Sequence, residues 1–289
     1  MKQIVFISGK GGTGKSTLVA SLSQIVENKM LADCDVDAPN LHILLKENVI
    51  EKKDYYGAKE AFIDKDKCLQ CGICRQTCKF GAISEDFEIL PFTCEGCGAC
   101  TLVCPANVIH LEDVKTGNTF VSETERGTFS HALLDIGADG SGRLVTEVRK
   151  NAKNHENGED WLLIDGSPGI GCVVIASITG ADAVVAVSEP TMSGISDLQR
   201  VLAVAKFFDI PGFVCINKYD LNMEMTKKIE DFCSENGFQV IGKIPFDPKI
   251  VNALREFKTP IDAGLTDITL EMKSIWKKIS EQVSNKVKN

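Results

Sequence analysis

The sequence predicts an α/β protein, in which a doubly wound, mostly parallel sheet carries a small inserted α+β domain. Short apolar runs rich in β-branched residues alternate with helical patterns, which is typical of a parallel sheet covered by helices. The alternation breaks between residues 60 and 112, and eight of the twelve cysteines fall between Cys68 and Cys104. We therefore predict a main domain formed by residues 1–59 and 113–289 and an inserted domain formed by residues 60–112.

The elements of the main domain follow in order along the chain. The predicted strands are residues 3–8, 30–33, 161–165, 183–187, 213–217 and 239–243. The predicted helices are residues 16–27, 143–153, 195–208, 224–236 and 265–286. Residues 116–142 are rich in Gly, Thr and Ser and predict a hairpin and a loop. The last helix is amphipathic over residues 270–286, and we expect its apolar stripe to pack on the sheet, although such a helix can also contact a membrane.

Composition limits the classes of function. The net charge of −8 argues against non-specific nucleic-acid binding, which needs clustered Lys and Arg. The apolar run at residues 4–7 is too short for a signal peptide, and the longest uncharged stretch, residues 166–181, is too short and too interrupted to span a membrane. We therefore expect a cytoplasmic protein. In a reducing compartment, twelve cysteines indicate metal binding rather than disulfides.

A glycine-rich loop joins the first predicted strand to the first predicted helix. Residues 9–16 read G-K-G-G-T-G-K-S and fit the pattern G-x-x-x-x-G-K-S/T in its strand–loop–helix context. Such a loop points backbone N–H groups at phosphates, and the helix N-terminus adds a positive end. We expect Lys15 to reach the β- and γ-phosphates and Ser16 to ligate Mg²⁺, the alternative being a turn without a ligand. The expected nucleotide-binding residues here are Gly11, Gly12, Thr13, Gly14, Lys15, Ser16 and Thr17.

The loop has a second lysine, Lys10, and K-G-G-T-G-K-S-T resembles the deviant Walker A loop of the MinD/ParA/Mrp/nitrogenase-iron-protein superfamily of P-loop ATPases. The resemblance implies an ATP-dependent dimer, either a homodimer or a heterodimer with a related ATPase. In that dimer Lys10 would reach across the interface to the partner's nucleotide. The alternative is a solvated loop lysine.

Two further segments support this resemblance. Residues 31–41 (L-A-D-C-D-V-D-A-P-N-L) look like the first switch of the superfamily, where Asp35 takes the place of the aspartate that positions or deprotonates the attacking water. Residues 164–169 (I-D-G-S-P-G) resemble the second switch, where Asp165 would contact the magnesium shell. An aspartate that ends a strand can instead cap a helix. The implied catalytic residues are Lys10, Lys15, Asp35 and Asp165.

The resemblance also implies a base site. Asn217 and Lys218 follow the fifth predicted strand and Pro245 follows the sixth, so that these residues would surround the base, with Asn217 bonded to adenine. Residues 217–220 read N-K-Y-D, which has the form of the guanine-reading string N-K-x-D. We expect ATP, and GTP stays open.

The inserted segment contains an internal repeat with metal-ligand spacing. The pattern C-x2-C-x2-C-x3-C occurs twice, offset by 26 residues, and it is typical of two 4Fe–4S clusters, with the fourth cysteine of each half reaching the other cluster. The segment resembles bacterial two-cluster ferredoxins, except that Lys79 stands where proline is common. Zinc is the alternative. The expected ligands are Cys68, Cys71, Cys74 and Cys104 for one cluster, and Cys94, Cys97, Cys100 and Cys78 for the other.

Four cysteines lie outside the repeat. We expect Cys34, Cys215 and Cys233 to be packed thiols within strands or helices. Cys172 follows Asp165 by seven residues, the offset at which the nitrogenase iron protein has a ligand of its bridging cluster. A redox or metal role for Cys172 and a packed thiol beside the switch are both open.

Together these features predict an ATPase that contains a ferredoxin-like module. The first hypothesis is ATP-gated electron transfer, in which the nucleotide state of a dimer moves the clusters toward an acceptor. The second is a carrier or assembly factor for iron–sulfur or related cofactors, acting on an apo-metalloprotein. The third is a regulatory switch whose module senses redox state and whose ATP-bound dimer recruits a partner.

Overall fold

The computed structural model describes residues 1–285, and contacts divide the chain into two compact units. The main unit comprises residues 1–52, 119–133 and the chain from Gly140 onward. The second unit comprises residues 53–118 and 134–139. The predicted inserted segment, 60–112, lies inside the second unit. The second unit is wider because strands β3 (Asn48–Ile63) and β4 (Ile109–Thr124) extend beyond the cysteine motifs on both sides.

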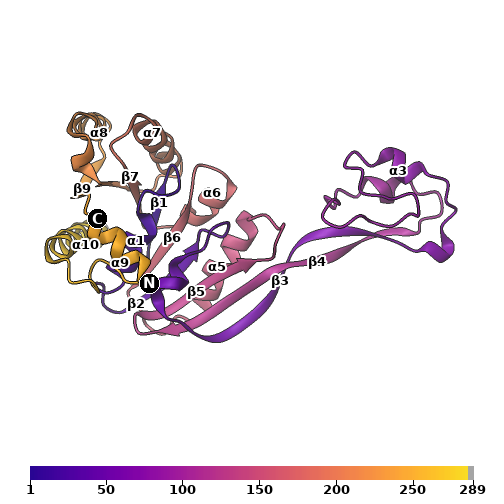
Figure 1. The fold of residues 1–289 in the computed structure, drawn as a ribbon, viewed down its shortest axis with the longest axis horizontal. Coiled ribbons are helices and arrows are strands. Elements are labelled where there is room, and N and C mark those ends of the chain that lie inside the picture. The colour runs from indigo at the N-terminus through magenta and orange to yellow at the C-terminus, as the bar shows by residue number, and fades with distance from the viewer. Residues whose placement is uncertain (286–289) are drawn as a thin grey trace. The chain divides into compact units, whose positions relative to one another are not determined.

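The main unit is built on a parallel sheet, as predicted (Figure 1). Its central order is β2-β6-β1-β7-β8-β9, and every neighbouring pair in this run is parallel. All six predicted strands are present, as β1 (Lys2–Ser8), β2 (Lys29–Cys34), β6 (Trp161–Pro168), β7 (Ala183–Ser188), β8 (Gly212–Asn217) and β9 (Gln239–Ile244). Their side chains are almost entirely buried, which is expected of parallel strands covered on both faces.

Helices cover both faces of this sheet. One face packs against α1 (Lys15–Leu22), α2 (Leu41–Leu45), α9 (Pro248–Arg255) and α10 (Thr266–Asn285). The other face packs against α5 (Gly142–Asn154), α6 (Cys172–Ile178), α7 (Met192–Phe207) and α8 (Met223–Glu235). The short 3₁₀ helix η2 (Tyr219–Leu221) precedes α8. The loops that carry the predicted motifs lie at the carboxyl ends of the parallel strands.

The C-terminal helix packs on the sheet, which confirms the expectation for its apolar stripe. Met272, Ile275, Ile279 and Val283 are each at most 5% exposed. Trp276 meets Trp161 edge-on, with 4.9 Å between ring centroids. Residue 286 of the predicted helix lies outside the described residues. Among the described residues, no helix combines the length and apolar character needed to cross a membrane.

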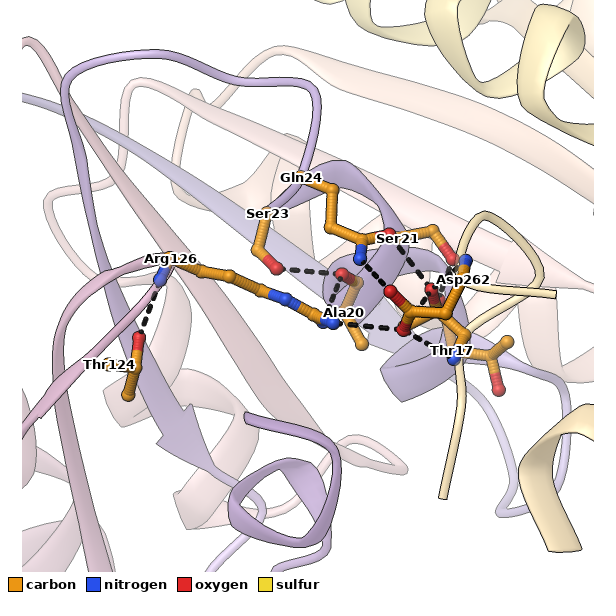
Figure 2. Close-up of polar contacts among 9 residues, drawn as sticks. Thr17, Ala20, Ser21, Ser23, Gln24, Thr124, Arg126 and Asp262 are labelled. Carbon is orange, nitrogen blue, oxygen red and sulfur yellow. Dashed lines mark hydrogen bonds and ion pairs between the residues drawn. The ribbon is translucent and has the colours of Figure 1, made fainter. Parts of the chain in front are cut away.

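The helix after the glycine loop is shorter than predicted, because α1 ends at Leu22 instead of residue 27. Its last carbonyls need donors, since a helix leaves its final C=O groups without internal partners. Figure 2 shows that Ala20 O accepts from Ser23 Oγ (2.7 Å) and from Arg126 Nη1 (3.2 Å). Arg126 also donates to Asp262 Oδ2 at 2.9 Å. These bonds close the helix and tie it to a distant turn.

Arg126 lies in the turn between β4 and β5 (Gly127–Leu134), and these two strands form a hairpin. The hairpin and loop predicted for residues 116–142 are therefore confirmed. The sheet order continues as β3-β4-β5-β2, and β5 is parallel to β2. Only antiparallel neighbours can be joined by a two-residue connection, so β4 runs against β5. Contacts between Gly57 and Thr116 and between Asp64 and Val108 show that β3 and β4 also run in opposite directions.

The second unit repeats one local structure twice. A 3₁₀ turn η1 (Lys65–Lys67) leads into the first cysteine motif, and the two motifs end in α3 (Ile73–Thr77) and α4 (Ala99–Val103). Each short helix begins after a left-handed glycine, Gly72 (φ 78°) or Gly98 (φ 74°). Gln70 (φ 53°) and Gly96 (φ 59°) match in the same way. The sequence offset of 26 residues is therefore also a structural repeat.

Candidate nucleotide and metal sites

The glycine loop forms the floor of a ligand-sized cavity at the carboxyl ends of the strands. The cavity has a volume of about 490 Å³, and its wall includes all seven predicted loop residues together with Asp35 and Asn217. The lining residues from the predicted loop set are Gly11, Gly12, Thr13, Gly14, Lys15, Ser16 and Thr17. Gly14 has φ 89°, and a Cβ there would lie 2.3 Å from Asn217 Nδ2, so the loop needs glycine at this position.

Lys15 lies beneath this cavity in a buried cluster of acids. Its Nζ is 2.5 Å from Asp165 Oδ1 and 3.6 Å from Asp35 Oδ2. The strand register explains the cluster, because Asp33 on β2 is paired with Asp165 on β6. Parallel strands end at the same edge of a sheet, so residues far apart in sequence meet here. The structure thus brings together three of the four residues predicted to be catalytic.

Burial and charge perturb these groups together. Burial opposes the charge of Lys15, but the carboxylates of Asp165 and Asp35 outweigh it and raise the pKa of Lys15. Burial raises the pKa of Asp35, against the opposing effect of Lys15. Burial, reinforced by Asp165, raises the pKa of Asp33 to about 8. A buried carboxyl with a strongly perturbed pKa beside a cavity is typical of a functional site.

Asp33 is a site residue that sequence reasoning missed. It is fully buried, and its Oδ1 accepts from the Asp35 backbone N–H at 3.0 Å. Its Oδ2 accepts from the backbone N–H groups of Asn40 (3.2 Å) and Leu41 (3.0 Å). The Asp33 side chain therefore holds both ends of residues 35–41, which belong to the segment that resembles the first switch. The signal was present in the sequence, since Asp33 ends a buried strand two residues before Asp35.

Lys10 lies apart from that cluster. Its Nζ is 3.5 Å from Glu189 Oε2 and 3.3 Å from Ser193 Oγ, and its side chain is 36% exposed. The same Glu189 carboxylate accepts from Lys218 Nζ at 2.5 Å. Glu189 was missed by sequence reasoning because its two lysine partners come from loops distant in the chain. Lys10 is thus held within its own subunit by an acid at the end of β7.

Two of the three residues predicted for the base site, Asn217 and Lys218, line the cavity. Asn217 Nδ2 donates to Thr13 O at 2.8 Å, and Asn217 Oδ1 accepts from the Lys218 backbone N–H at 3.0 Å. The amide nitrogen of Asn217 therefore braces the glycine loop, while its oxygen bonds the next residue of its own chain segment. Pro245 is not among the residues that line the cavity, although its neighbour Ile244 is. The apolar wall comes from Ile244 and from residues that were not predicted, namely Ile250, Val251, Leu254 and Met272.

The donor set fits a magnesium nucleotide. Within residues 1–285, Asp165 Oδ2 and Thr13 Oγ1 are buried without a hydrogen-bond partner, and both lie at the glycine loop. A buried polar atom without a partner is costly and calls for a ligand, ion or water. Asp165 and Ser16 offer oxygen ligands of the kind that Mg²⁺ prefers, and Lys15 offers a positive charge for phosphate.

The cysteines of the second unit enclose two separate cavities. One is lined by Cys68, Cys71, Cys74 and Cys104, which are the four ligands predicted for one cluster. The other is lined by Cys78, Cys94, Cys97 and Cys100, the four predicted for the second cluster. The remaining walls are mainly apolar, with Ile109 and Val108 at the first cavity and Ile83 and Ile89 at the second. The fourth cysteine of each half therefore faces the cavity of the other half.

Backbone amides point at three of these sulfurs. Gln70 N donates to Cys68 Sγ (3.4 Å), Ala82 N to Cys78 Sγ (3.4 Å) and Ala61 N to Cys94 Sγ (3.5 Å). Such bonds stabilise thiolate charge and help to set the potential of a bound cluster. In residues 1–285, no group of three or more His, Cys, Asp or Glu side chains converges closely enough for a single metal ion.

Of the four cysteines outside the repeat, three are buried and one is exposed. Cys34, Cys215 and Cys233 are buried, which confirms the expectation of packed thiols. Burial raises the pKa of the Cys215 thiol to about 12 and that of Cys233 to about 11. Cys172 is exposed as the first residue of α6. A packed role for Cys172 is therefore wrong, and its redox role stays a prediction.

Known proteins share both parts of this chain. The family model of the CobQ/CobB/MinD/ParA nucleotide binding domain matches residues 4–261. An uncharacterized protein of Methanocaldococcus jannaschii is 30% identical over 258 residues, covering 86% of this chain and 87% of the relative. The structure of the septum site-determining protein MinD with Mg-ADP from Pyrococcus horikoshii has the same fold, with a TM-score of 0.58, 18% identity, and coverage of 96% of this chain and 95% of that one.

Two further relatives match this chain over different lengths. The pyruvate synthase subunit PorD of Methanothermobacter marburgensis is 43% identical over 54 residues, which is 19% of this chain and 67% of that subunit. An iron-sulfur cluster carrier protein of Methanocaldococcus jannaschii is 26% identical over 310 aligned positions, covering 98% of this chain and 86% of the carrier.

Proposed function

This chain belongs to the CobQ/CobB/MinD/ParA nucleotide-binding family, and we propose that it is an ATPase whose nucleotide state is coupled to electron transfer through two 4Fe–4S clusters. The observation that carries the proposal is the presence in one chain of two kinds of site. A Lys15–Asp165 phosphate site lies in the main unit, and two cavities, each lined by four cysteines, lie in the second.

The nucleotide part of the proposal rests on charge. Arriving phosphates compete with Asp165 and Asp35 for Lys15, which now stands 2.5 Å from one and 3.6 Å from the other. Ser16 and Asp165 hold Mg²⁺ and its shell. Asp35, released from Lys15, is the group that positions or deprotonates the attacking water. Its carboxyl lies 8% exposed at the cavity wall, where water can reach it.

The active form is a dimer closed across the nucleotide, formed with a second copy or with a related ATPase. Lys10 is the residue that crosses the interface, and Glu189 and Ser193 hold it in the single chain. When bound, the clusters supply one-electron chemistry. Cys68, Cys71, Cys74 and Cys104 hold one cluster, and Cys78, Cys94, Cys97 and Cys100 hold the other.

Redox titration of the anaerobically reconstituted protein tests this proposal. After iron analysis has established full sites, the midpoint potentials of the clusters are measured with and without MgATP. Coupling predicts a shift of about 60 mV or more, since about 59 mV for one electron corresponds to a tenfold difference in ATP affinity between the redox states. Equal potentials would contradict electron transfer gated by ATP.

A second candidate function is favoured by the iron-sulfur cluster carrier protein that aligns with 98% of this chain. In this case the clusters are cargo, and the nucleotide controls their release to an apo-metalloprotein. Incubation of the reconstituted protein with a colourless apo-ferredoxin distinguishes the two functions. Transfer of iron and sulfide that depends on MgATP, together with unchanged cluster potentials, supports the carrier and contradicts the redox protein. We propose a cytoplasmic protein that acts on such a protein partner and not on nucleic acid, consistent with its charge of −8.

A further inference from the structure

A partly buried group of four aromatic rings includes His42, which follows the first switch segment. His131 on β5 lies near Phe120 and Phe129, with ring centroids 4.9 and 4.8 Å away. The ring of His42 on α2 stacks on His131 at 5.4 Å, with 7° between the two planes. All four rings lie in the main unit. Histidine in such a stack presents polar nitrogens where leucine or phenylalanine would fill the same space.

The stack is also anchored by an acid. Glu47 Oε2 accepts from His131 Nε2 at 2.8 Å and from Ser122 Oγ at 2.7 Å. His131 is fully buried, and its burial, opposed by Glu47, lowers its pKa. Across the described part of the chain, the Nδ1 atoms of His42 and His131 find no hydrogen-bond partner. A buried polar group that is incompletely paired is costly.

The stack is joined to the nucleotide site through Asp33. That carboxylate lies beside Lys15 and Asp165 and accepts from the backbone N–H groups of Asn40 and Leu41, the residue before α2 and its first residue. His42 is the next residue of the same five-residue helix. A change in the partners of Lys15 therefore changes the charge next to the side chain that holds the start of α2.

On its other side the stack contacts the strands that lead to the clusters. Phe120 and Ser122 belong to β4, Phe129 and His131 to β5, and Glu47 immediately precedes β3. Strands β3 and β4 continue into the second unit and bound the cysteine motifs on both sides in sequence. The stack thus joins the helix after the first switch to β5, and His131 in turn contacts Phe120 on β4 and Glu47 before β3.

We propose that the His42–His131 stack relays the nucleotide state from the first switch to β4 and β5, and through them to the cluster module. This inference rests on the proposed function and assigns its coupling to a specific contact. The relay runs from Lys15 to Asp33, from Asp33 to the start of α2, and from His42 to His131. The first step is the electrostatic interaction between Lys15 and Asp33, and the later steps are hydrogen bonds and a ring contact between described residues.

The test compares His42→Ala, which removes the ring, with His42→Phe, which keeps a ring able to stack. Ile43→Ala is the matched control, because Ile43 is the next residue of α2 and is 45% exposed. The reconstituted full-length proteins are examined by hydrogen exchange of backbone amides with and without a nonhydrolysable MgATP analogue. In the wild type, His42→Phe and Ile43→Ala, the analogue is expected to change exchange at least threefold in both residues 35–45 and β5. In His42→Ala the change is expected in residues 35–45 but not in β5.

The outcomes separate the relay from the function on which it rests. If β5 of His42→Ala responds to the analogue as the wild type does, or if wild-type β5 does not respond at all, the relay is overturned. Loss of the β5 response in His42→Ala alone supports it. The cluster potentials are measured on the same samples. A wild-type β5 that responds while the potentials stay constant contradicts coupled electron transfer and leaves the mechanical relay supported.

Discussion

At the scale of single residues, the site is dominated by a lysine surrounded by acids. Removing Lys15 in a Lys15→Met variant leaves Asp165, Asp33 and Asp35 without their cation. Removal of one partner of a buried ion pair typically costs about 3–5 kcal/mol. We expect the free energy of unfolding without nucleotide, measured in urea, to fall by about that amount, and MgATP binding to be lost.

The second lysine of the same loop is the control. Lys10 is 36% exposed, so Lys10→Met is expected to change the free energy of unfolding by less than about 0.5 kcal/mol. An equal loss of stability in the two variants would contradict the assignment of Lys15 as the buried counter-charge.

Asp33 predicts a particular dependence of stability on pH. Its pKa is about 8 in the folded protein and 3.8 for an aspartate side chain exposed to water, so the folded chain binds the proton more tightly than the unfolded chain. Its contribution therefore favours folding less and less as the pH rises from about 4 to about 8. In an Asp33→Asn variant this loss of stability with rising pH is absent, because the asparagine side chain does not titrate. The free energy of unfolding of the wild type should fall more steeply than that of the variant, by up to about 1.4 kcal/mol per pH unit.

Denaturation in urea at several pH values, without nucleotide, measures that difference. Parallel profiles for the wild type and Asp33→Asn would show that Asp33 is already ionised in the folded state, and they would contradict the prediction.

Residues that act through local motifs were predictable, and residues that act through tertiary contacts were not. Gly14, Lys15 and Ser16 stand in a fixed pattern, so their place could be predicted from the chain alone. Glu189 carries no motif, and its importance comes from the meeting of Lys10 and Lys218 on one carboxylate. Asn217 lies beside the glycine loop, and the bond from its amide nitrogen to Thr13 O could not be predicted from its place in the sequence.

At the scale of elements, one position in the repeat of the cysteine motifs places a different demand on the backbone in each half. Gly96 has φ 59°, and a Cβ on it would lie 2.4 Å from Lys59 O. Its counterpart Gln70 has φ 53° and carries a full side chain. We therefore expect Gly96→Ala to distort the loop between Cys94 and Cys97, and iron to fall from about eight to about four per chain after reconstitution.

Gln70→Ala is the matched variant in the other half of the repeat, and it is expected to retain the full iron content. Iron and acid-labile sulfide are measured after removal of unbound metal. Full iron in Gly96→Ala, or equal losses in the two variants, would contradict this account of the second cysteine loop.

The end of α1 gives a second prediction at this scale. Arg126 bridges Ala20 O and Asp262, so Arg126→Met removes one donor from a helix carbonyl and one from a carboxylate (Figure 2). We expect the free energy of unfolding to fall by about 1–3 kcal/mol in urea denaturation. Glu125→Gln, an exposed change in the same turn, should lie within about 0.5 kcal/mol of the wild type. A neutral Arg126→Met would show that the bridge does not support the helix.

The elements that the sequence missed have physical reasons for being missed. Most side chains of β3 are exposed, so the strand lacks the alternation of buried and exposed residues that predicts a half-buried strand. Helices α3 and α4 have five residues each and are set by the cysteine loops rather than by an apolar stripe. Helix α9 was predictable, because Asp247 and Pro248 form a helix start of the usual kind.

At the scale of the whole molecule, strands β3 and β4 run from the unit with the nucleotide cavity into the unit with the cysteine cavities. The central parallel sheet followed from the alternation of strands and helices, which is a property of long segments. The extent of the second unit did not, since β3 and β4 continue past the predicted inserted segment on either side. The proposed function requires that nucleotide binding in the main unit and the redox state of the clusters in the second unit are energetically coupled.

That claim is tested most directly by the affinity of the fully reconstituted protein for a nonhydrolysable MgATP analogue in the oxidised and in the reduced state. Linkage requires the ratio of the two dissociation constants to match the change in cluster potential caused by the nucleotide. We predict a ratio of about ten or more, corresponding to about 59 mV for one electron. Equal dissociation constants in the two redox states, with all clusters present, would contradict the coupling of nucleotide state to electron transfer.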